Sequence, residues 1–488
     1  SGCSVTTSSK NDRIVKVNAK EDNGYICAIG RFGFDSLKAA NRITAPMKKQ
    51  GGKLVPTTWE DASSLAADAL KKAGANAGFI VAGSLTNEDA YAVQELCREV
   101  AGSANIDTPA SVYAGGLIPA LRSVYGNAGV TVASKADLKA ADVVVLIGAD
   151  PSQKKQSLQE VEVMVRRRAQ AGAKVIVVNP DKIELAGHQN AIHLNLKEGT
   201  DTVLLAGLMS AAIAEGATSS VKGLDALKKS LVNVDQAASG SGVSAELIAS
   251  AGKAYAAAKQ PVVVIGAGIA ANLEASLQAL NLALVKGAGV LPVMLEANAL
   301  GVVQMGCVPD KSAGGADVKK TGTGYAGMKS GMKALYVAGN APDMDFKADM
   351  LIVQASHMTP LAEKADLVLP MTAVYEQSGT IMNTYGVIKA VSASQTPAGE
   401  ARDGVEIAAG IAAAAGKTKA FKAKDIIAAV KKVKAGKLGA GTVNPVEAKA
   451  VKPYAVDASA LLKAMNQGML SGSGVSKVMV VKQPVLQK

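Results

Sequence analysis

Cysteine and aromatic residues are scarce in this sequence, and their scarcity excludes two classes of protein. The 488 residues include four cysteines, too few to staple a small secreted domain through disulfides. Aromatic residues make up only 3% of the chain, with one tryptophan, so the exposed rings on which single-stranded nucleic acid stacks are lacking. We therefore expect a reduced, intracellular setting and no nucleic-acid partner.

Long apolar runs are also missing. No uncharged apolar stretch reaches the roughly 18 residues that a membrane-spanning helix requires, and the residues after Ser1 contain no signal-peptide core. The chain is nevertheless 49% hydrophobic, which at this length is enough for about three domains with buried cores. The composition therefore indicates a multi-domain globular protein.

Charge is distributed unevenly along the chain. The formal net charge is +12, and residues 417–452 contain ten lysines against Asp425 and Glu447. A segment this basic can face nucleic acid, anionic lipid or an acidic protein. A simpler interpretation is a lysine-rich surface exposed to water, and the sequence identifies no partner for this segment.

Buried strands alternate with helices through most of the chain. Short, nearly continuous apolar runs predict strands that are covered on both faces. These runs occupy residues 78–82, 141–147, 174–178, 261–265, 334–338 and 350–354, and helical patterns occupy 59–72, 86–101, 156–171, 202–215 and 275–286. The alternation predicts an α/β fold with more than one doubly wound parallel sheet.

Small and acidic residues follow several of the predicted strands. In open α/β sheets, ligands bind beyond the carboxyl ends of the strands, where glycine lets backbone N–H groups approach a phosphate. The candidate nucleotide-binding residues are Gly148, Asp150, Asp181, Gly199, Thr200 and Asp201. None of these turns forms a complete G-x-G-x-x-G motif, and any doubly wound sheet needs small residues at its turns.

Residues that would mark a familiar catalytic or metal centre are not found. The three histidines lack the spacing of zinc ligands, and there is no phosphate-binding P-loop or nucleophile elbow. Cys3 and Cys27 supply two thiols where an iron–sulfur cluster needs four. Unrelated thiols, or a lipid attached to Cys3, are alternatives to a cluster.

Seven segments, taken in order and spacing, resemble one family. They are residues 27–33, 42–47, 55–62, 141–151, 365–370, 376–386 and 397–402. Together they resemble the molybdopterin oxidoreductases, which include formate dehydrogenases and the G (large iron–sulfur) subunit of NADH-quinone oxidoreductase, complex I. Residues 297–306 resemble the complex I subunit more than formate dehydrogenase.

The resemblance implies doubly wound parallel sheets of the molybdopterin oxidoreductase type. We divide the chain into a small β-rich iron–sulfur subdomain at 1–55 with part of 371–415, an α/β domain at 56–130 plus 295–370, a Rossmann-like domain at 131–294 and a Lys/Ala-rich extension at 416–488. The family's cluster motif is C-x2-C-x3-C followed by a fourth cysteine. Cys3 and Cys27 match its third and fourth positions. The resemblance therefore implies a [4Fe-4S] cluster whose remaining ligands would lie before Ser1 and are not in this chain.

Two departures from the family concern its catalytic metal. Catalytic members hold Mo or W through two pterins and a Cys, selenocysteine or Ser side chain. The matching stretch, residues 105–116, has no cysteine, and Ser111 is its only candidate oxygen ligand. The residues after Gly416 are too few and too lysine-rich for the family's C-terminal β-barrel. We therefore expect a fold without the metal ligand, without the barrel and without molybdopterin guanine dinucleotide.

The leading hypothesis is a non-catalytic peripheral-arm subunit of an NADH-quinone oxidoreductase, acting as a scaffold beside iron–sulfur clusters. Its partners would be the NADH/FMN-binding and the quinone-proximal iron–sulfur subunits, and it would meet the cytoplasmic face of the inner membrane only through the complex. The alternative is a catalytic formate dehydrogenase-like subunit that holds Mo/W-bis(pterin guanine dinucleotide) at the six strand-end residues. A plain nucleotide-binding regulator is a third hypothesis.

Overall fold

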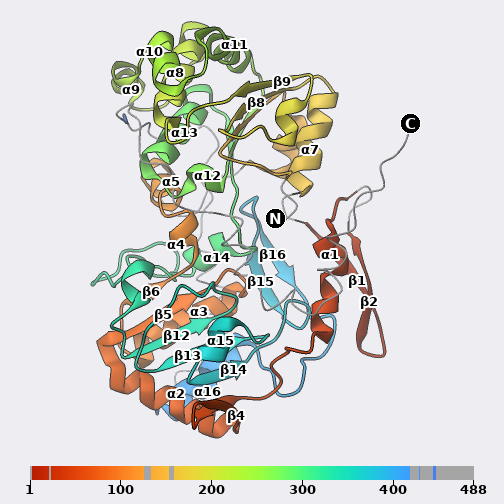
Figure 1. Ribbon diagram of the computed structural model, residues 1–488, viewed down its shortest axis with the longest axis vertical. Coiled ribbons are helices and arrows are strands. Elements are labelled where there is room, and N and C mark those ends of the chain that lie inside the picture. The colour runs from red at the N-terminus through yellow and green to blue at the C-terminus, as the bar shows by residue number, and fades with distance from the viewer. Residues whose placement is uncertain are drawn as a thin grey trace.

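The computed structural model describes residues 3–20, 24–125, 133–152 and 159–417, together with the single positions 428, 443, 445 and 446. Two α/β lobes, each built around a mainly parallel sheet, lie one above the other in Figure 1. The C-terminal extension at 416–488 lies almost entirely outside the described residues. Within the described ranges, no helix is long and apolar enough to cross a bilayer.

The upper lobe in Figure 1 contains a parallel sheet of five strands. In spatial order these are β11 (Gly289–Pro292), β10 (Pro261–Ile265), β7 (Val143–Ile147), β8 (Lys174–Val178) and β9 (Ala191–Leu194). The chain runs outward from β7 through β8 to β9, then returns to β10 and β11 on the other side. The strand order therefore reverses between β7 and β10, the switch point at which doubly wound sheets bind ligands.

Helices cover both faces of this sheet. They are α5 (Leu117–Tyr125), α6 (Lys135–Ala140), α7 (Gln159–Gln170), α8 (Asp201–Ala214), α9 (Leu224–Ser230), α10 (Val234–Ser241), α11 (Ala245–Ala256), α12 (Ala267–Ala270) and α13 (Leu273–Lys286), with a short turn, η4 (Glu184–Gly187). Successive strand residues point to opposite faces. Val145 of β7 therefore belongs to the core with α5, α8 and α13, whereas Leu146 belongs to the core with α7.

The lower lobe contains a sheet of seven strands. In spatial order these are β4 (Lys53–Pro56), β3 (Met47–Gln50), β14 (Leu367–Pro370), β13 (Leu351–Ala355), β12 (Ala334–Ala338), β5 (Ala77–Val81) and β6 (Asn105–Asp107). The five strands from β14 to β6 are parallel, and β3 and β4 are antiparallel to their neighbours. The switch point of this sheet lies between β5 and β12.

One face of the seven-stranded sheet carries longer helices than the other. The first face is covered by α2 (Trp59–Ala73), α3 (Asn87–Glu95), the π-helical turn η3 (Leu96–Val100) and α16 (Gly404–Ala414); the second is covered by η5 (Tyr325–Lys329) and α15 (Pro360–Lys364). The short elements η2 (Gly74–Asn76), α4 (Ala110–Tyr113) and α14 (Ala299–Gln304) connect these layers. The confirmed fold class is thus α/β with doubly wound parallel sheets.

The N-terminal region is small and rich in strands, as the sequence predicted. It contains the hairpin of β1 (Val5–Lys10) and β2 (Arg13–Ala19), followed by α1 (Ala28–Phe32) and η1 (Gly33–Lys38); a second hairpin, β15 (Gly379–Met382) and β16 (Ile388–Val391), comes from the later chain. The sequence predicted residues 47–55 as part of this region, but β3 and β4 extend the large sheet, because β3 pairs with β14 rather than with β1 or β2.

Candidate functional site

Glycines that pack on one another close the switch point of the five-stranded sheet. Gly148 follows β7 with a φ of +54°, a conformation that favours glycine. Its carbonyl oxygen accepts a hydrogen bond of 2.9 Å from the N–H of Gly268. A Cβ on Gly266 would lie 2.3 Å from the same oxygen. The contact between the two turns accounts for these glycines without a bound phosphate.

The two predicted aspartates at this sheet edge serve local turns. Asp150 accepts hydrogen bonds from the hydroxyl of Ser152 and from its N–H at 3.1 Å. Asp181 is exposed, and its own N–H donates to the side chain of Asn179 at 2.9 Å. Such side-chain-to-backbone bonds are typical of turns, so neither contact requires a ligand.

The last three candidates shape the start of α8. Gly199 is buried with a φ of +81°. The hydroxyl of Thr200 donates to the carbonyl of Lys197 at 2.6 Å, and Asp201, 5% exposed, is the first residue of the helix. The parallel register brings these residues to the same sheet edge as Gly148, but the Thr200 hydroxyl is bonded within the turn and Asp201 is buried at the start of α8.

A buried carboxylate fills the switch point of the seven-stranded sheet. Glu296, 7% exposed, comes from the segment that joins β11 to α14. It accepts a hydrogen bond of 2.6 Å from the N–H of Gly83, just after β5, and one of 3.1 Å from the hydroxyl of Tyr113. A Cβ on Gly83 would lie 2.7 Å from the Cβ of Glu296. A backbone N–H that could face an anionic ligand therefore faces the chain's own carboxylate.

Burial strongly affects the ionisation of Glu296. Loss of hydration raises its pKa from 4.5 to about 7, although the bonds from Gly83 and Tyr113 oppose this shift. The pKa of the Tyr113 phenol rises well above its ordinary value, because that phenol is also buried and lies beside the carboxylate. The pair is thus held in a water-poor environment, as an interior structural contact would be.

Asn298 extends this contact to the second hairpin. Its side-chain amide donates to the carbonyl of Leu85 at 2.8 Å and to the side chain of Asn87 at 3.1 Å. Its side-chain oxygen accepts from the N–H of Met382, in β15, at 2.7 Å. The segment after β11 therefore ties the carboxyl edge of the large sheet to β15.

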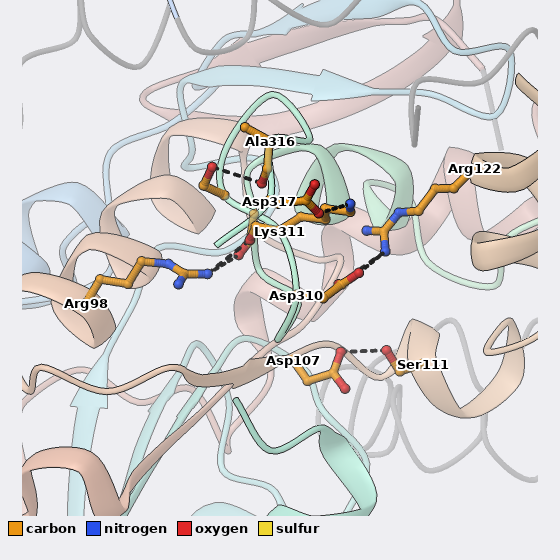
Figure 2. Close-up of polar contacts among 10 residues, drawn as sticks. Arg98, Asp107, Ser111, Arg122, Asp310, Lys311, Ala316 and Asp317 are labelled. Carbon is orange, nitrogen blue, oxygen red and sulfur yellow. Dashed lines mark hydrogen bonds and ion pairs between the residues drawn. The ribbon is translucent and has the colours of Figure 1, made fainter. Parts of the chain in front are cut away.

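Ser111, the candidate metal ligand, is hydrogen-bonded to a neighbouring carboxylate. Figure 2 shows its hydroxyl pointing to Asp107, at 2.5 Å. Asp107 also accepts from the N–H groups of Thr108 at 2.8 Å and Tyr325 at 2.7 Å. Burial raises the pKa of Asp107 despite these three donors. The serine thus lies in α4, the short helix after β6, with its hydroxyl bonded to Asp107.

Two arginines anchor the loop at residues 310–331, between α14 and β12. Arg98 donates to the carbonyl of Lys311 at 3.0 Å, and Arg122 forms an ion pair with Asp310 at 3.0 Å (Figure 2). Tyr325 is 3% exposed. The loop is therefore packed against the lobe rather than projecting from it.

Cys3 and Cys27 both belong to the N-terminal region and are half-buried. Cys27 caps α1, where its sulfur accepts the N–H of Gly30 at 3.4 Å. Ser4, next to Cys3, accepts a backbone hydrogen bond from Lys20 at 2.9 Å. Among the described residues, no group of three or more His, Cys, Asp or Glu side chains could hold a metal ion. The described thiols therefore supply only part of a ligand set.

Sequence reasoning missed the most deeply buried ion pair. Arg42 donates to Glu376 at 2.7 Å, and their side chains are 5% and 0% exposed. Arg42 also donates to the carbonyl of Ser356, beyond β13, at 2.8 Å. Desolvation lowers the arginine's pKa, opposed by Glu376. Both residues fall in segments that carried the family resemblance, but their separation in the chain hid their contact.

Comparison with known proteins agrees with this architecture. Residues 42–414 match the family model described as Molybdopterin oxidoreductase, so the chain belongs to the molybdopterin oxidoreductase family. It is 28% identical over 462 residues to the NADPH-Fe(3+) oxidoreductase subunit alpha of Geobacter sulfurreducens, with 83% of this chain and 53% of that protein covered. It is 28% identical over 432 residues to NADH-quinone oxidoreductase subunit 3 of Thermus thermophilus, with coverage of 86% and 50%.

Formate dehydrogenases and one solved enzyme structure are also similar. The F420-dependent formate dehydrogenase subunit alpha of Methanocaldococcus jannaschii is 26% identical over 455 residues, with 82% of this chain and 66% of that protein covered. The fold matches that of acetylene hydratase from Pelobacter acetylenicus with a TM-score of 0.70 at 18% identity, covering 89% of this chain and 70% of that one. The chain thus spans about half to two thirds of the length of these curated relatives.

Proposed function

We propose that this chain is a non-catalytic subunit of a multi-subunit, NADH-quinone oxidoreductase-like electron-transfer assembly. The observation that carries the proposal is the Glu296 carboxylate, which accepts the N–H of Gly83 at 2.6 Å at the switch point of the large sheet. Family members with a pterin need their crevices open to an anionic cofactor. The Glu296 carboxyl group competes with such a cofactor by its volume and by its use of the Gly83 N–H as a donor.

The residues present do not fit a pterin-bound metal. Ser111 is bonded to Asp107, and both switch points are filled by contacts within the chain. Gly148, Asp150 and Thr200 would have to give up turn contacts to reach a nucleotide. These contacts support a body without its own active site.

The two half-buried thiols support a role beside an iron–sulfur cluster. Cys3 and Cys27 would be two of four ligands of a [4Fe-4S] cluster, and the other two would come from polypeptide outside this chain. When bound, the cluster supplies one-electron transfer. Cys27 holds its sulfur at the start of α1, where the N–H of Gly30 already donates to it.

Two of the relatives support membership of a multi-subunit assembly. They are subunits of an NADPH-Fe(3+) oxidoreductase and an NADH-quinone oxidoreductase. By analogy, partners of this chain would be the NADH/FMN-binding and quinone-proximal iron–sulfur subunits, at the cytoplasmic face of the inner membrane. A formate dehydrogenase-like catalytic subunit is the second candidate, favoured by a relative of nearly equal identity.

Formate-dependent dye reduction separates the two candidates. The protein would be isolated with its natural flanking sequence and partner subunits, and iron would be followed by electron paramagnetic resonance after reduction. We expect a cluster signal that Cys27→Ser abolishes or alters, and no formate-dependent reduction. Formate oxidation by the isolated assembly, lost on substitution of Ser111 by Ala, would favour the catalytic candidate instead.

A further inference from the structure

Exposed apolar side chains are concentrated in one region of the described chain. Eight large apolar residues of that part of the chain are strongly exposed, and six belong to the N-terminal hairpin, α1 or the segment 374–388. They are Val5, Val15, Phe32, Val374, Val387 and Ile388. Val15 is 57% and Phe32 39% exposed. Scattered apolar residues need no explanation, but this concentration does.

A β-bulge turns Val15 toward solvent. Ser8 pairs with Lys16 and Ser9 pairs with Ile14, so Val15 is the extra residue of β2. Ile14 and Val17, three positions apart, are therefore both buried, at 2% and 1% exposure. Ile14 and Val17 of the hairpin therefore pack against the rest of the protein, whereas Val15 faces solvent.

Polar contacts hold the hairpin against the later chain. The hydroxyl of Thr7 lies 2.8 Å from that of Ser394, and the carboxylate of Asp12 accepts the N–H of Thr396 at 3.1 Å. Tyr375 in turn donates to the carbonyl of Gly30 at 3.3 Å. These contacts fix the hairpin, α1 and residues 374–396 relative to one another, so their outer side forms a defined surface.

A hollow of about 480 Å³ lies between β2, η1 and Gln395. Its lining is Arg13, Ile14, Phe34, Leu37, Lys38 and Gln395. Apolar side chains thus sit beside two cations. The guanidinium of Arg13 makes no hydrogen bond or ion pair with any residue that the structure describes, and Lys38 meets Asp35 only at 3.8 Å with 63% of its side chain exposed. Both cations are available to a carboxylate.

The chain around the hollow is also positively charged. Over the described part of residues 3–38, the exposed cations are Lys10, Arg13, Lys16, Lys20, Arg31 and Lys38. The acidic residues of that part are Asp12, which bonds to Thr396, and Asp35, which meets Lys38. The lysine-rich stretch at 417–452 would be repelled here, which excludes it as an occupant on electrostatic grounds.

We propose that this hollow, together with the exposed residues Val15 and Phe32 that neighbour its lining in the chain, binds an acidic polypeptide of a partner subunit. A carboxylate of the partner enters between Arg13 and Lys38, and an apolar partner side chain packs on Val15 and Phe32. The inference rests on the proposed function, since it assigns the contact through which the chain joins its assembly. Opposite charge steers such an encounter, and buried apolar area holds the complex.

The test uses the full chain and a synthetic peptide in which Asp and Glu alternate with Leu and Phe. Fluorescence anisotropy gives its Kd for wild type, the double variant Arg13→Glu/Lys38→Glu, and Val15→Asp. Matched controls are Lys253→Glu and Leu247→Asp, which change exposed residues on α11 of the other lobe. We expect about tenfold or greater weakening for the first two variants and less than about twofold for the controls.

The double variant could lose binding simply because it is less stable. A second peptide, with Lys in place of Asp and Glu, distinguishes this case. It should bind the double variant more tightly than wild type. Equal affinities across all variants would overturn the proposal, as would binding of anionic phospholipid vesicles or RNA without binding of the acidic peptide. Iron analysis of the intact assembly, isolated with its natural flanking sequence and partners, tests the proposed function separately, because none of these substitutions changes Cys3 or Cys27.

Discussion

Polar groups are buried at the two sheet edges but partly exposed in the N-terminal region. At the edges, Gly148 and Gly83 meet other parts of the chain, and the Glu296 carboxylate is enclosed. In the N-terminal region, two thiols are half-buried and Arg13 has no partner among the described residues. The difference teaches that one chain can enclose the polar groups at its sheet edges and leave thiols and a cation partly open in its N-terminal region.

Breaking the buried ion pair should have the largest effect on the closed interior. Arg42→Met leaves the Glu376 carboxylate, 0% exposed, without its cation, and should lower the free energy of unfolding by about 3–5 kcal/mol. Denaturant unfolding measures this. The double variant Arg42→Met/Glu376→Met should recover most of the loss, and a double variant as unstable as the single one would contradict the account.

Forcing apart the turns that contain Gly148 and Gly266 should cause the second largest loss of stability. Gly266→Ala places a Cβ 2.3 Å from the carbonyl oxygen of Gly148 and should cost about 2–3 kcal/mol, measured by thermal or denaturant unfolding. Gly187→Ala is the matched control, because no neighbouring atom lies within 4 Å of the position that its added Cβ would take. Equal stability of both variants would show that the turns are not in close contact.

The Glu296 contact predicts a pH dependence with a definite sign. Its pKa is raised from 4.5 to about 7 in the folded state, so the folded chain holds the proton more tightly. Its contribution to stability is complete below about pH 4.5 and is lost as the pH rises through about 7. Relative to wild type, Glu296→Gln should be nearly neutral at pH 5 and stabilising by about 1–3 kcal/mol at pH 8.

Asp89 titrates in the same range, because burial and Asp403 raise its pKa to about 7. Asp89 contributes equally to the pH dependence of stability in wild type and in Glu296→Gln. Its contribution therefore cancels when the free energies of unfolding of the two proteins are subtracted. The exposed Glu198→Gln is the control and should show no such divergence between pH 5 and pH 8. If the stability difference between wild type and Glu296→Gln were the same at pH 5 and pH 8, Glu296 would be hydrated in the folded chain.

The smallest effect should come from the open surface. Val15→Asp changes a residue that is 57% exposed at a bulge, so the free energy of unfolding should change by less than about 0.5 kcal/mol. Val17→Asp, in the same strand but 1% exposed, is the matched contrast and should destabilise strongly. Similar losses for both would show that Val15 is covered.

Local pattern explains why most of the fold was predictable. Apolar runs such as 174–178 and 261–265 became β8 and β10 with the predicted bounds, because strands buried on both faces need continuous apolar sequence. Thr86 caps α3, accepting the N–H of Asp89 at 3.1 Å, at the start of the predicted helical pattern. The helix predicted from 86 to 101 divides into α3 and a π-helical turn, which no pattern indicated.

The candidate site was less predictable because its contacts join distant residues. Glu296 meets Gly83 across 213 positions of chain, and a lone glutamate before an apolar segment carries no local signal. The strand-end residues were found at the predicted edge, since parallel strands carry their carboxyl ends together. Whether a turn faces a ligand or another turn depends on side chains elsewhere, which periodicity does not encode.

Metal content of the intact assembly tests the central claim most directly. The protein, isolated with its natural flanking sequence and partners from cells supplied with molybdate and tungstate, would be analysed for Mo, W and Fe per chain. We predict iron, and neither molybdenum nor tungsten above background, because Glu296 holds the crevice of the large sheet. One Mo or W per chain, released together with a pterin on denaturation, would contradict the account.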